Sequence, residues 1–218
     1  MDPAFAHHQT FLTMRRLFTL VLALALALPC LAGGASGRFR SGIEWGANFS
    51  FWQFYHFNYI SDAGARVDSQ DSHFTNYING TLRAHAGVLL SPAWELDLVS
   101  GYVGLWDDRA VVPVNLRLAF YRGGCDLDGG LRLFLEGGPL IGRAKGDAVS
   151  WLVREGAGRR IMLSDRLSMD LILSLQQSID HPGGSVFDPG HGIYIPEGNA
   201  LRSNTSYCAL CFSVALNL

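Results

Sequence analysis

The sequence has little charge and almost no lysine. Only 17% of its 218 residues are charged, against 49% that are hydrophobic, and Lys145 is the one lysine among 17 basic residues. This composition excludes a disordered chain, which needs low hydrophobicity and high charge. A formal net charge of −2 also implies no basic surface, so we expect no nucleic-acid partner.

Cysteine is scarce as well. Apart from Cys30, the chain has only Cys125, Cys208 and Cys211, an odd number that does not fit a disulfide framework. Cys208 and Cys211 lie three positions apart in a segment of alternating polarity, where such positions point to opposite faces. We therefore predict neither a redox site nor a zinc site there.

A long apolar run occurs near the start of the chain. Arg15 and Arg16 precede it, the run extends from Leu17 to Leu28, and small residues follow at 32–35, which is the pattern of a secretory signal. About 12 apolar residues are too few for a membrane-spanning helix, which needs roughly 20. We predict an upstream extension plus a cleavable signal peptide over residues 1–35, and one exported domain over residues 36–218.

Beyond residue 35, apolar and polar residues alternate with a period of two. In the segment 43–51, for example, Trp45 and Phe49 are separated from their apolar neighbours by Gly46, Asn48 and other small or polar residues, which indicates a β-strand. The segments with this pattern are 43–51, 78–90, 94–102, 112–120, 131–141, 149–161, 167–175 and 207–218. The sixth is the least regular because either phase leaves Arg154 or Glu155 on an apolar face, so we expect a bulge or a rim position there.

The connections between these eight segments differ in length. Residues 55–74 and 179–202 are long, whereas residues 91–93 and 164–166 are tight turns. Short turns on one rim and long loops on the other are typical of outer-membrane barrels. The predicted fold is therefore all-β: an eight-stranded antiparallel up-and-down transmembrane barrel in a bacterial outer membrane, preceded by the signal peptide.

The polar face of the strands separates this fold from a soluble barrel. A soluble periplasmic lipocalin-like binding barrel, which is one alternative, would carry many charged side chains on the face that meets water. Here that face is rich in Gly, Ala, Ser and Asn, which suits the narrow lumen of eight strands. We predict a filled lumen rather than a pore, with a network of paired polar side chains. Its members are Glu44, Arg83, His85, Glu95, Asp97, Arg117, Arg132, Glu136 and Asp170.

Aromatic residues fall mostly near the ends of the predicted strands. They are Trp45, Trp94, Tyr102, Trp106, Phe120 and Tyr121. Aromatic rings settle at the two interfaces of a membrane. We predict that these side chains form the girdles of the barrel.

With these features the chain resembles the small outer-membrane β-barrel proteins of Gram-negative bacteria, the outer-membrane-protein-A-like family. The resemblance rests on the signal, on residues 156–158 leading to 163–168, on residues 111–118 and on the final amphipathic strand. It implies contact with outer-membrane lipid and lipopolysaccharide, and insertion by the barrel-assembly machinery. It implies an architecture rather than an activity.

Catalysis finds little support in the sequence. The last long connection supplies the residue types of a nucleophile, base and acid, namely His181, Ser185, Asp188, His191 and Glu197. A lipid A-modifying acyl hydrolase or acyltransferase is therefore a second alternative. The lipid A 3-O-deacylases carry a His-x-Ser-Asn run on a strand, however, and the comparable segment 176–180 reads Gln-Gln-Ser-Ile-Asp. We predict no catalytic residues.

The two long connections also suggest metal and ligand sites. Metal-ligating residue types occur at Asp62, Asp68, Asp71 and His73, and again at His181, Asp188 and His191, but neither set has a recognised ligand spacing. We expect no metal and no cofactor. Aromatic residues are more numerous than solubility requires, at Trp52, Phe54, Tyr55, Phe57, Tyr59 and Tyr194. Either they contact an extracellular ligand or lipopolysaccharide sugar, in a structural or surface-interaction role, or residues 55–59 simply continue the first strand above the membrane.

Overall fold

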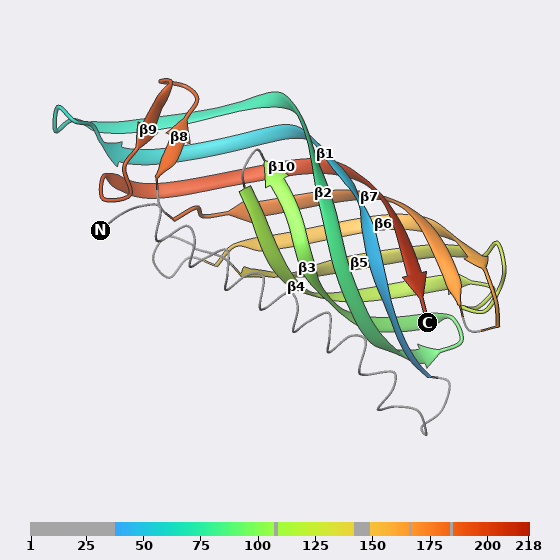
Figure 1. The fold of residues 1–218 in the computed structure, drawn as a ribbon. Helices are drawn as coiled ribbons and strands as arrows, with labels where there is room; N and C mark the ends of the chain where they lie inside the picture. The colour runs from blue at the N-terminus through green and yellow to red at the C-terminus, as the bar shows by residue number, and fades with distance from the viewer. Residues whose placement is uncertain (1–37, 107–108, 142–148, 166, 184) are drawn as a thin grey trace.

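Eight long antiparallel strands close into a ring in the order β1-β10-β7-β6-β5-β4-β3-β2 (Figure 1). The computed structural model describes residues 38–106, 109–141, 149–165, 167–183 and 185–218, so the predicted signal peptide lies outside the described residues. Within those ranges no helix is long and apolar enough to cross a membrane. The predicted eight-stranded up-and-down topology is confirmed.

The strands have the following bounds: β1 Phe39–Ile60, β2 Arg66–Ser91, β3 Trp94–Trp106, β4 Arg109–Arg122, β5 Leu131–Ile141, β6 Trp151–Met162, β7 Ser168–Asp180, β8 Val186–Asp188, β9 Ile193–Ile195 and β10 Ala200–Asn217. Pairing of β1 with β10 closes the ring, and Ser41 and Leu218 exchange backbone hydrogen bonds at its end. Both described ends of the chain therefore lie at one rim, here called the terminal rim. The opposite rim is the far rim.

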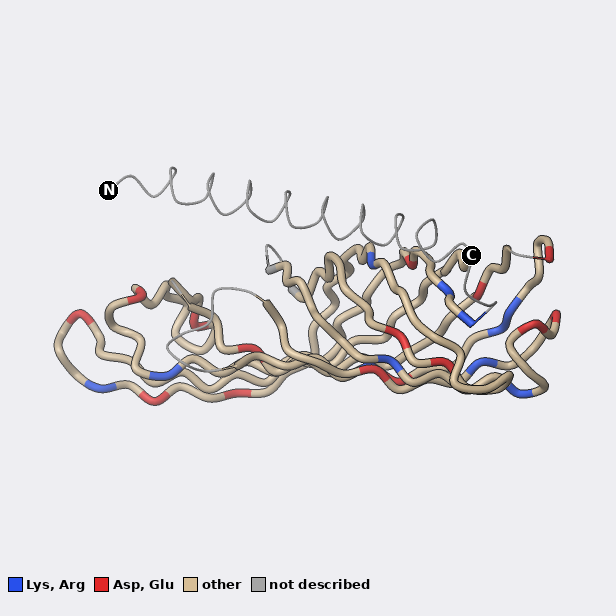
Figure 2. Tube along the Cα trace, turned by 90° about the horizontal axis from the view of Figure 1, so that it is seen from below, with Lys and Arg blue, Asp and Glu red and all other residues tan. Residues whose placement is uncertain are grey.

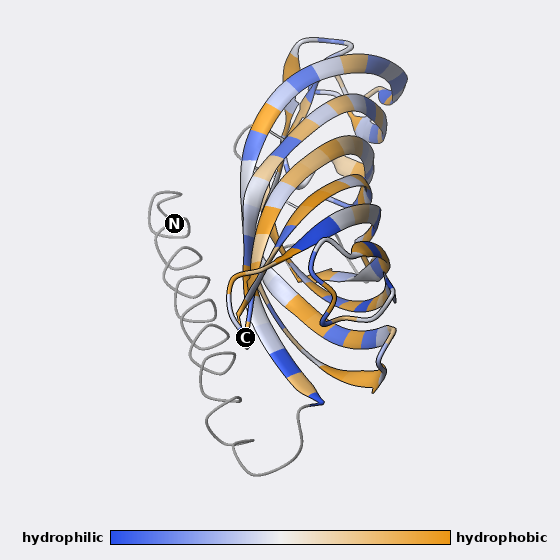
Figure 3. Cartoon of the chain, turned by 90° about the vertical axis from the view of Figure 1, so that its right-hand side faces the viewer, coloured by the Kyte–Doolittle hydropathy of each residue, from blue (hydrophilic) through white to orange (hydrophobic). Residues whose placement is uncertain are grey.

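Alternation along each strand gives the wall two contrasting faces (Figure 3). In β5, Leu133 and Leu135 are 44% and 58% exposed, whereas Arg132 and Glu136 are fully buried. Successive side chains of a strand point to opposite faces, so the exposed apolar row must lie outside the ring and the charged row inside it. This is the reverse of a soluble barrel, and it is the arrangement of a transmembrane barrel.

The first long connection is not a loop. Strands β1 and β2 continue as a paired ribbon up to a tight turn at 61–65, where the Ser61 N–H donates to the Ala65 carbonyl at 2.8 Å and Gly64 adopts a φ of +75°. The prediction of a long loop over 55–74 was wrong, and the alternative that residues 55–59 continue the first strand is what the chain adopts. Residues 68–72 are polar on both faces of β2, so no alternation marks them as a strand.

The last connection is also partly ordered into strands. Strand β7 ends at Asp180, β10 begins at Ala200, and the short strands β8 and β9 pair between them. The ends of β1, β2 and β10 extend together beyond the ring, and the β8–β9 hairpin lies beside them (Figure 1). We call this assembly the platform: residues 52–60, 66–77, 181–183 and 185–206.

Strand β6 is regular despite its irregular pattern. It pairs without a register shift with β5 and with β7. Neither the bulge nor the rim position predicted here occurs, because Glu155 lies in mid-strand, and register shifts occur instead in the pairings of other strands, such as the one between Ser50 and Trp52 in β1. Arg154 points into the lumen and Glu155 points out of the ring. The charge that disturbed the sequence pattern therefore lies on the outer face.

Some of the residues predicted for the aromatic girdle lie on the outer face of the barrel. Trp45, Trp94 and Tyr102 are exposed on the outer face, and the Trp94 and Phe120 rings lie 5.0 Å apart there. Tyr121 is different, because it follows Phe120 and therefore points inward, where it is buried. The side chain of Trp106 lies outside the described part of the structure.

Candidate functional site

The polar residues predicted for the lumen all point inward and are at most 2% exposed. They are Glu44, Arg83, His85, Glu95, Asp97, Arg117, Arg132, Glu136 and Asp170. The structure adds three side chains that the sequence analysis did not assign to the lumen: Arg154, Arg160 and Tyr121. Together these residues are called the lumen network.

Glu44 is the centre of the first half of the network. Its carboxylate accepts hydrogen bonds from Arg83 at 2.5 Å, from Arg117 at 2.8 Å and from Arg154 at 2.7 Å. The Ser213 hydroxyl donates a fourth, at 2.7 Å. These donors come from β2, β4, β6 and β10, so one carboxylate on β1 ties together strands from around the ring.

Glu136 on β5 binds two of the same arginines from the other side. It accepts hydrogen bonds from Arg83 at 2.8 Å and from Arg117 at 2.6 and 2.9 Å. The side-chain amide of Asn115 adds a hydrogen bond at 2.7 Å. Such charge-assisted bonds are short and strong, and two carboxylates sharing arginines hold the side chains in one arrangement.

Asp170 on β7 is the centre of the second half. Arg132 donates to it at 2.8 Å, and Arg160 donates at 2.7 and 2.9 Å. Arg160 also donates to the Tyr121 hydroxyl at 3.0 Å, and that hydroxyl donates to Glu95. This half therefore links β3, β4, β5, β6 and β7.

The Phe134 ring lies between the two halves. The guanidinium carbons of Arg117, Arg154 and Arg132 lie 4.9, 5.2 and 5.7 Å from its centroid. Cations are attracted to the face of an aromatic ring, particularly where water is excluded. Phe134 thus separates the like charges of three arginines while it stabilises each of them.

Asp97 and His85 lie at the edge of the network. The Asp97 carboxylate is 3.6 Å from Arg132, and no described side chain hydrogen-bonds to either of its oxygens. His85 Nε2 lies 3.0 Å from the Asn217 side-chain oxygen rather than beside a carboxylate. The predicted members therefore do not all meet in one cluster.

The charges of the lumen network cancel when all groups are ionised. Five arginines and five carboxylates take part: Arg83, Arg117, Arg132, Arg154 and Arg160, with Glu44, Glu95, Asp97, Glu136 and Asp170. An uncompensated charge in such a buried place costs several kcal/mol, typically about 3–5 when one partner is removed. A neutral sum is therefore what a dry, filled lumen requires.

Toward the far rim the lumen also contains a largely apolar layer, next to buried uncharged polar residues such as Asn48, Ser50 and Gln53. The far ends of β3, β4, β5, β6 and β10 bury one cluster there, formed by Val103, Leu105, Val111, Leu140, Leu152 and Tyr207. The predicted polar network therefore occupies only part of the lumen. In Figure 2 a stretch of trace with few charged positions separates the charged positions of the ring from those of the platform.

The end of β3 leans across the lumen in this apolar layer. Asn48 on β1 donates to the Gly104 carbonyl at 3.2 Å, and Ser50 donates to the Leu105 carbonyl at 2.8 Å, although β2 lies between these strands in the ring. The lumen is thus filled by an ionic layer and by a largely apolar layer that also contains uncharged polar side chains.

A single buried carboxylate fastens the hairpin of the platform. Asp188 accepts hydrogen bonds from Tyr59 at 3.1 Å, Ser69 at 3.0 Å and the Gly190 N–H at 2.9 Å, and it pairs with His191 at 2.9 Å. Burial alone would raise the pKa of Asp188, but these hydrogen bonds outweigh it and hold the pKa below its ordinary value. The ionised form therefore stabilises the closed hairpin.

Apolar side chains complete this attachment. They form one buried cluster of Tyr55, Phe57, Tyr59, Ile195 and Ala200. Tyr55 and Phe57 stack with centroids 5.0 Å apart. Three of the aromatic residues considered as ligand contacts therefore pack the platform internally, while Phe54, Phe74 and Tyr194 remain exposed, the last two by 77% and 73%.

The candidate catalytic residues of the last connection are not brought together. Ser185 donates to the Ile195 carbonyl at 3.2 Å, and the His181 ring lies 2.7 Å from the Asn204 amide. The remaining histidine, His191, pairs with Asp188. No nucleophile thus adjoins a base among these side chains.

The candidate metal ligands form pairs at most. His56 and Asp68 lie 2.7 Å apart, and Asp71 and His73 lie 3.8 Å apart. In the part of the chain that the structure describes, no three His, Cys, Asp or Glu side chains gather into a metal-binding group.

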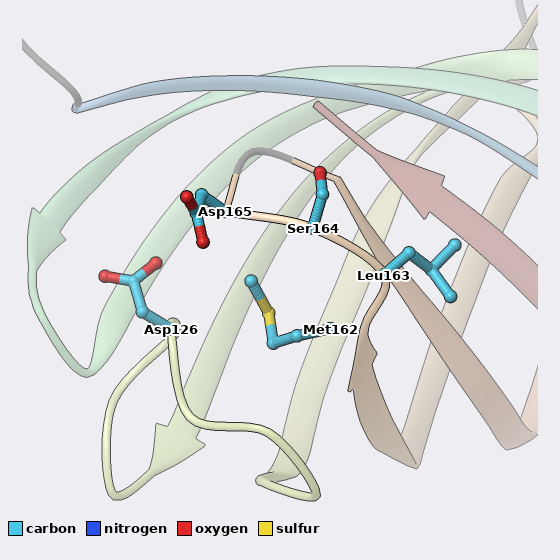
Figure 4. A pocket seen from close by; sticks show the side chains of 5 residues that line it. All are labelled: Asp126, Met162, Leu163, Ser164 and Asp165. Carbon is cyan, nitrogen blue, oxygen red and sulfur yellow. The ribbon is translucent and has the colours of Figure 1, made fainter.

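A pocket of about 440 Å³ lies at the terminal rim, between the connections that follow β4 and β6 (Figure 4). Its walls are formed by Asp126, Met162, Leu163, Ser164 and Asp165. The Ser164 hydroxyl accepts the Leu167 N–H at 3.1 Å, and Asp126 pairs with Arg40. Both groups thus serve the local connections, and we assign no chemistry to this pocket.

Comparison with known proteins finds no relative in sequence. No family model matches the chain, and no curated protein sequence matches it. Among solved structures, the outer membrane protein OprG from Pseudomonas aeruginosa is 12% identical with a TM-score of 0.46. The match covers 84% of this chain and 96% of that one. The N-terminal β-barrel domain of P. aeruginosa OprF is 14% identical, with a TM-score of 0.37 and coverage of 81% and 97%. The outer membrane protease OmpT from Escherichia coli is 9% identical, with a TM-score of 0.35 and coverage of 84% and 97%.

The architecture itself follows from the strands of this chain. A closed ring leaves no unpaired edge in the membrane, its outer face is apolar, and its inner face is filled by paired charges. The chain is therefore an eight-stranded β-barrel of the bacterial outer-membrane type.

Proposed function

We propose that this protein is a closed outer-membrane anchor that holds the platform above the outer leaflet, where it contacts the sugars of lipopolysaccharide. The observation that carries the proposal is the contrast between the two ends of the barrel. Connections of two to eight residues join the strands at the terminal rim, whereas β1, β2 and β10 run on beyond the far rim and carry an additional hairpin. In outer-membrane barrels the elaborated end faces the outside of the cell.

The filled lumen supports a structural role rather than transport. Side chains of the lumen network occupy the section near the terminal rim, and the apolar layer occupies the section near the far rim. An eight-stranded barrel has space for side chains and little else. We expect vesicles that contain the protein to swell no faster in arabinose than protein-free vesicles, while vesicles with a general porin swell. Swelling at the porin rate would contradict the closed anchor.

The exposed aromatic residues of the platform support contact with sugars. Phe74 and Tyr194 lie on separate elements, β2 and β9, and each presents most of its ring to the surroundings. A pair of aromatic rings contributes about 0.5–1.5 kcal/mol beyond the area that it buries, and we expect a ring packed on the apolar face of a sugar to contribute a similar amount. Two rings therefore suffice for a measurable preference.

Binding of purified lipopolysaccharide to the detergent-solubilised full chain tests this contact. We expect the double variant Phe74→Ser with Tyr194→Ser to bind about tenfold more weakly, the effect of roughly 0.7 kcal/mol from each ring. Leu127→Ser is the matched control, because Leu127 is an exposed apolar residue at the opposite rim. Unchanged binding of the double variant, or equal binding of lipid A that lacks the outer sugars of lipopolysaccharide, would contradict the proposal.

A further inference from the structure

Glu155 is an ionisable residue on the outer face of the barrel. It lies in the middle of β6, four residues from the exposed Trp151 and seven from the end of the strand at Met162. Four residues of a strand span about 13 Å, and the apolar band of such barrels is about 25 Å tall. Because strands are tilted, this spacing places Glu155 well inside the apolar band rather than at its border.

The neighbours of Glu155 on this face are apolar or small. Leu135 and Leu175 lie directly beside it on β5 and β7. Ala157 follows it on the same face of β6. One uncharged polar side chain lies close by, that of Gln177. Gln177 is exposed on β7 opposite Val153, and it therefore lies diagonal to Glu155.

The described part of the barrel supplies no partner for Glu155. Of the side chains that the structure describes, none donates a hydrogen bond to it. Arg159, the next charge on this face, differs, because its guanidinium lies beside Gly129 in the connection at the terminal rim. Long charged side chains near a membrane border reach water in this way. An ionisable group facing lipid is costly, and such groups generally mark a protein contact or a functional path.

We propose that the outer face of β5, β6 and β7 is the interface between two copies of this chain in the membrane, with Glu155 and Gln177 at its centre. A two-fold axis along the membrane normal places the same patch of each copy against the other. The Gln177 amide both donates and accepts hydrogen bonds, so each copy offers a donor to the Glu155 of the other. The patch therefore complements itself.

The surface around this pair permits close approach. Gly137 lies on the outer face of β5, opposite Val153, and Ala157 lies next to Glu155 on β6. Small residues are enriched where membrane-embedded segments pack, because they let the backbones come near each other. The inference requires only that the barrel lies in a bilayer, and it does not depend on the sugar contact of the platform.

Association of the full chain in lipid vesicles tests the interface. We expect a dimer by energy transfer between labelled copies, and we expect both Glu155→Leu and Gln177→Leu to weaken it about tenfold, the size of a hydrogen bond between membrane segments. Leu118→Gln is the matched control, because it changes an exposed position on β4 outside the patch.

A steric variant tests the same face without touching the polar pair. A Cβ at Gly137 would make only ordinary contacts, at 3.6 Å from the Leu152 carbonyl and 3.8 Å from Val153 Cγ2, so Gly137→Leu is compatible with the folded barrel. We expect it to prevent dimerisation while the purified protein keeps its heat-dependent gel migration. The gel migration thus reports folding, and the energy transfer between labelled copies reports association.

Cross-linking locates the contact. In a Cys208→Ser background, Ala157→Cys should cross-link to a second copy, whereas Leu98→Cys on β3 should not. A monomer at every protein-to-lipid ratio, equal cross-linking at both positions, or a dimer unaffected by Glu155→Leu and Gly137→Leu would overturn the proposal. Cross-linking of residue 157 to a different outer-membrane protein in place of a second copy would overturn it as well.

Discussion

Arg154 and Glu155 are neighbours in β6, yet the two sides of the barrel wall treat their charges in opposite ways. Arg154 donates hydrogen bonds to Glu44 and Ser174 and is buried in the lumen. Glu155 faces outward between leucines. The contrast teaches that a charge in this protein is stabilised by what the neighbouring strands supply, and that Arg154 finds partners on the inner face whereas Glu155 finds none among the described residues on the outer face.

The largest expected effect comes from removing the central carboxylate of the inner face. Glu44→Leu should lower the free energy of unfolding by about 3–5 kcal/mol, because Arg83, Arg117 and Arg154 lose their shared partner in a buried place. Urea unfolding in lipid vesicles, followed by tryptophan fluorescence, measures this. Asp97→Asn is the comparison variant: Asp97 has one ion pair, 3.6 Å from Arg132, and accepts no hydrogen bond from described residues, so we expect a smaller loss than for Glu44→Leu. Equal losses would contradict the assigned centre.

A charge added to the outer face should have the next largest effect. Leu173→Arg should destabilise the barrel by roughly 2–4 kcal/mol, because Leu173 faces lipid near the middle of β7. The same unfolding titration measures it. Phe74→Arg is also on an exposed apolar position but lies on the platform, outside the membrane, and should change stability by less than about 0.5 kcal/mol. If Leu173→Arg were as harmless as Phe74→Arg, the two faces would be reversed.

Substitutions of Arg154 and Glu155, the neighbours in β6, should change the free energy of unfolding in opposite directions. At dilutions where the chain is monomeric, Glu155→Leu should raise the free energy of unfolding by about 1 kcal/mol, since an acidic residue facing lipid costs less than a basic one but still costs free energy. Arg154→Leu should lower it, because Glu44 then loses a buried hydrogen-bond donor. A loss of stability in both variants would mean that Glu155 has a partner within its own barrel.

The smallest effect is local to the platform. The pKa of Asp188 lies below its ordinary value of 3.8, so its stabilising contribution is fully present above pH 3.8 and is lost as the pH falls through the lower value of the folded state. Hydrogen exchange of Val186–Ile195 should therefore stay slow down to pH 3.8 and rise only below it. Asp188→Ala should exchange fast at every pH while barrel stability is unchanged. Opening of the wild-type hairpin above pH 3.8 would contradict this attachment.

The strands of the ring were predictable because lipid on one side and a narrow lumen on the other impose strict alternation. Residues 131–135 illustrate this. Leu131, Leu133 and Leu135 identify the outer face, and Arg132 identifies the inner face. The inward direction of Glu44 and Arg117 followed from the same rule. What alternation could not indicate is which side chains from distant strands meet, and so the central position of Glu44 emerged only from the closed ring.

The misses have physical causes as well. Arg154 and Arg160 were overlooked because the outward Glu155 obscured the phase of β6. The apolar layer was overlooked because Val111 and Val112 are apolar on both faces of β4. The platform strands were taken for a loop because they leave the membrane, and with it the constraint that produces alternation.

The central claim is that this chain is a barrel with its apolar face toward lipid. The most direct measurement is the migration of the full chain, extracted in mild detergent from fractionated cells, on a gel with and without boiling. We expect the protein in the outer-membrane fraction, with an unboiled band that migrates faster than the boiled one because the closed barrel resists the detergent of the gel. Recovery in the soluble periplasmic fraction, or identical migration of the two samples, would contradict the account.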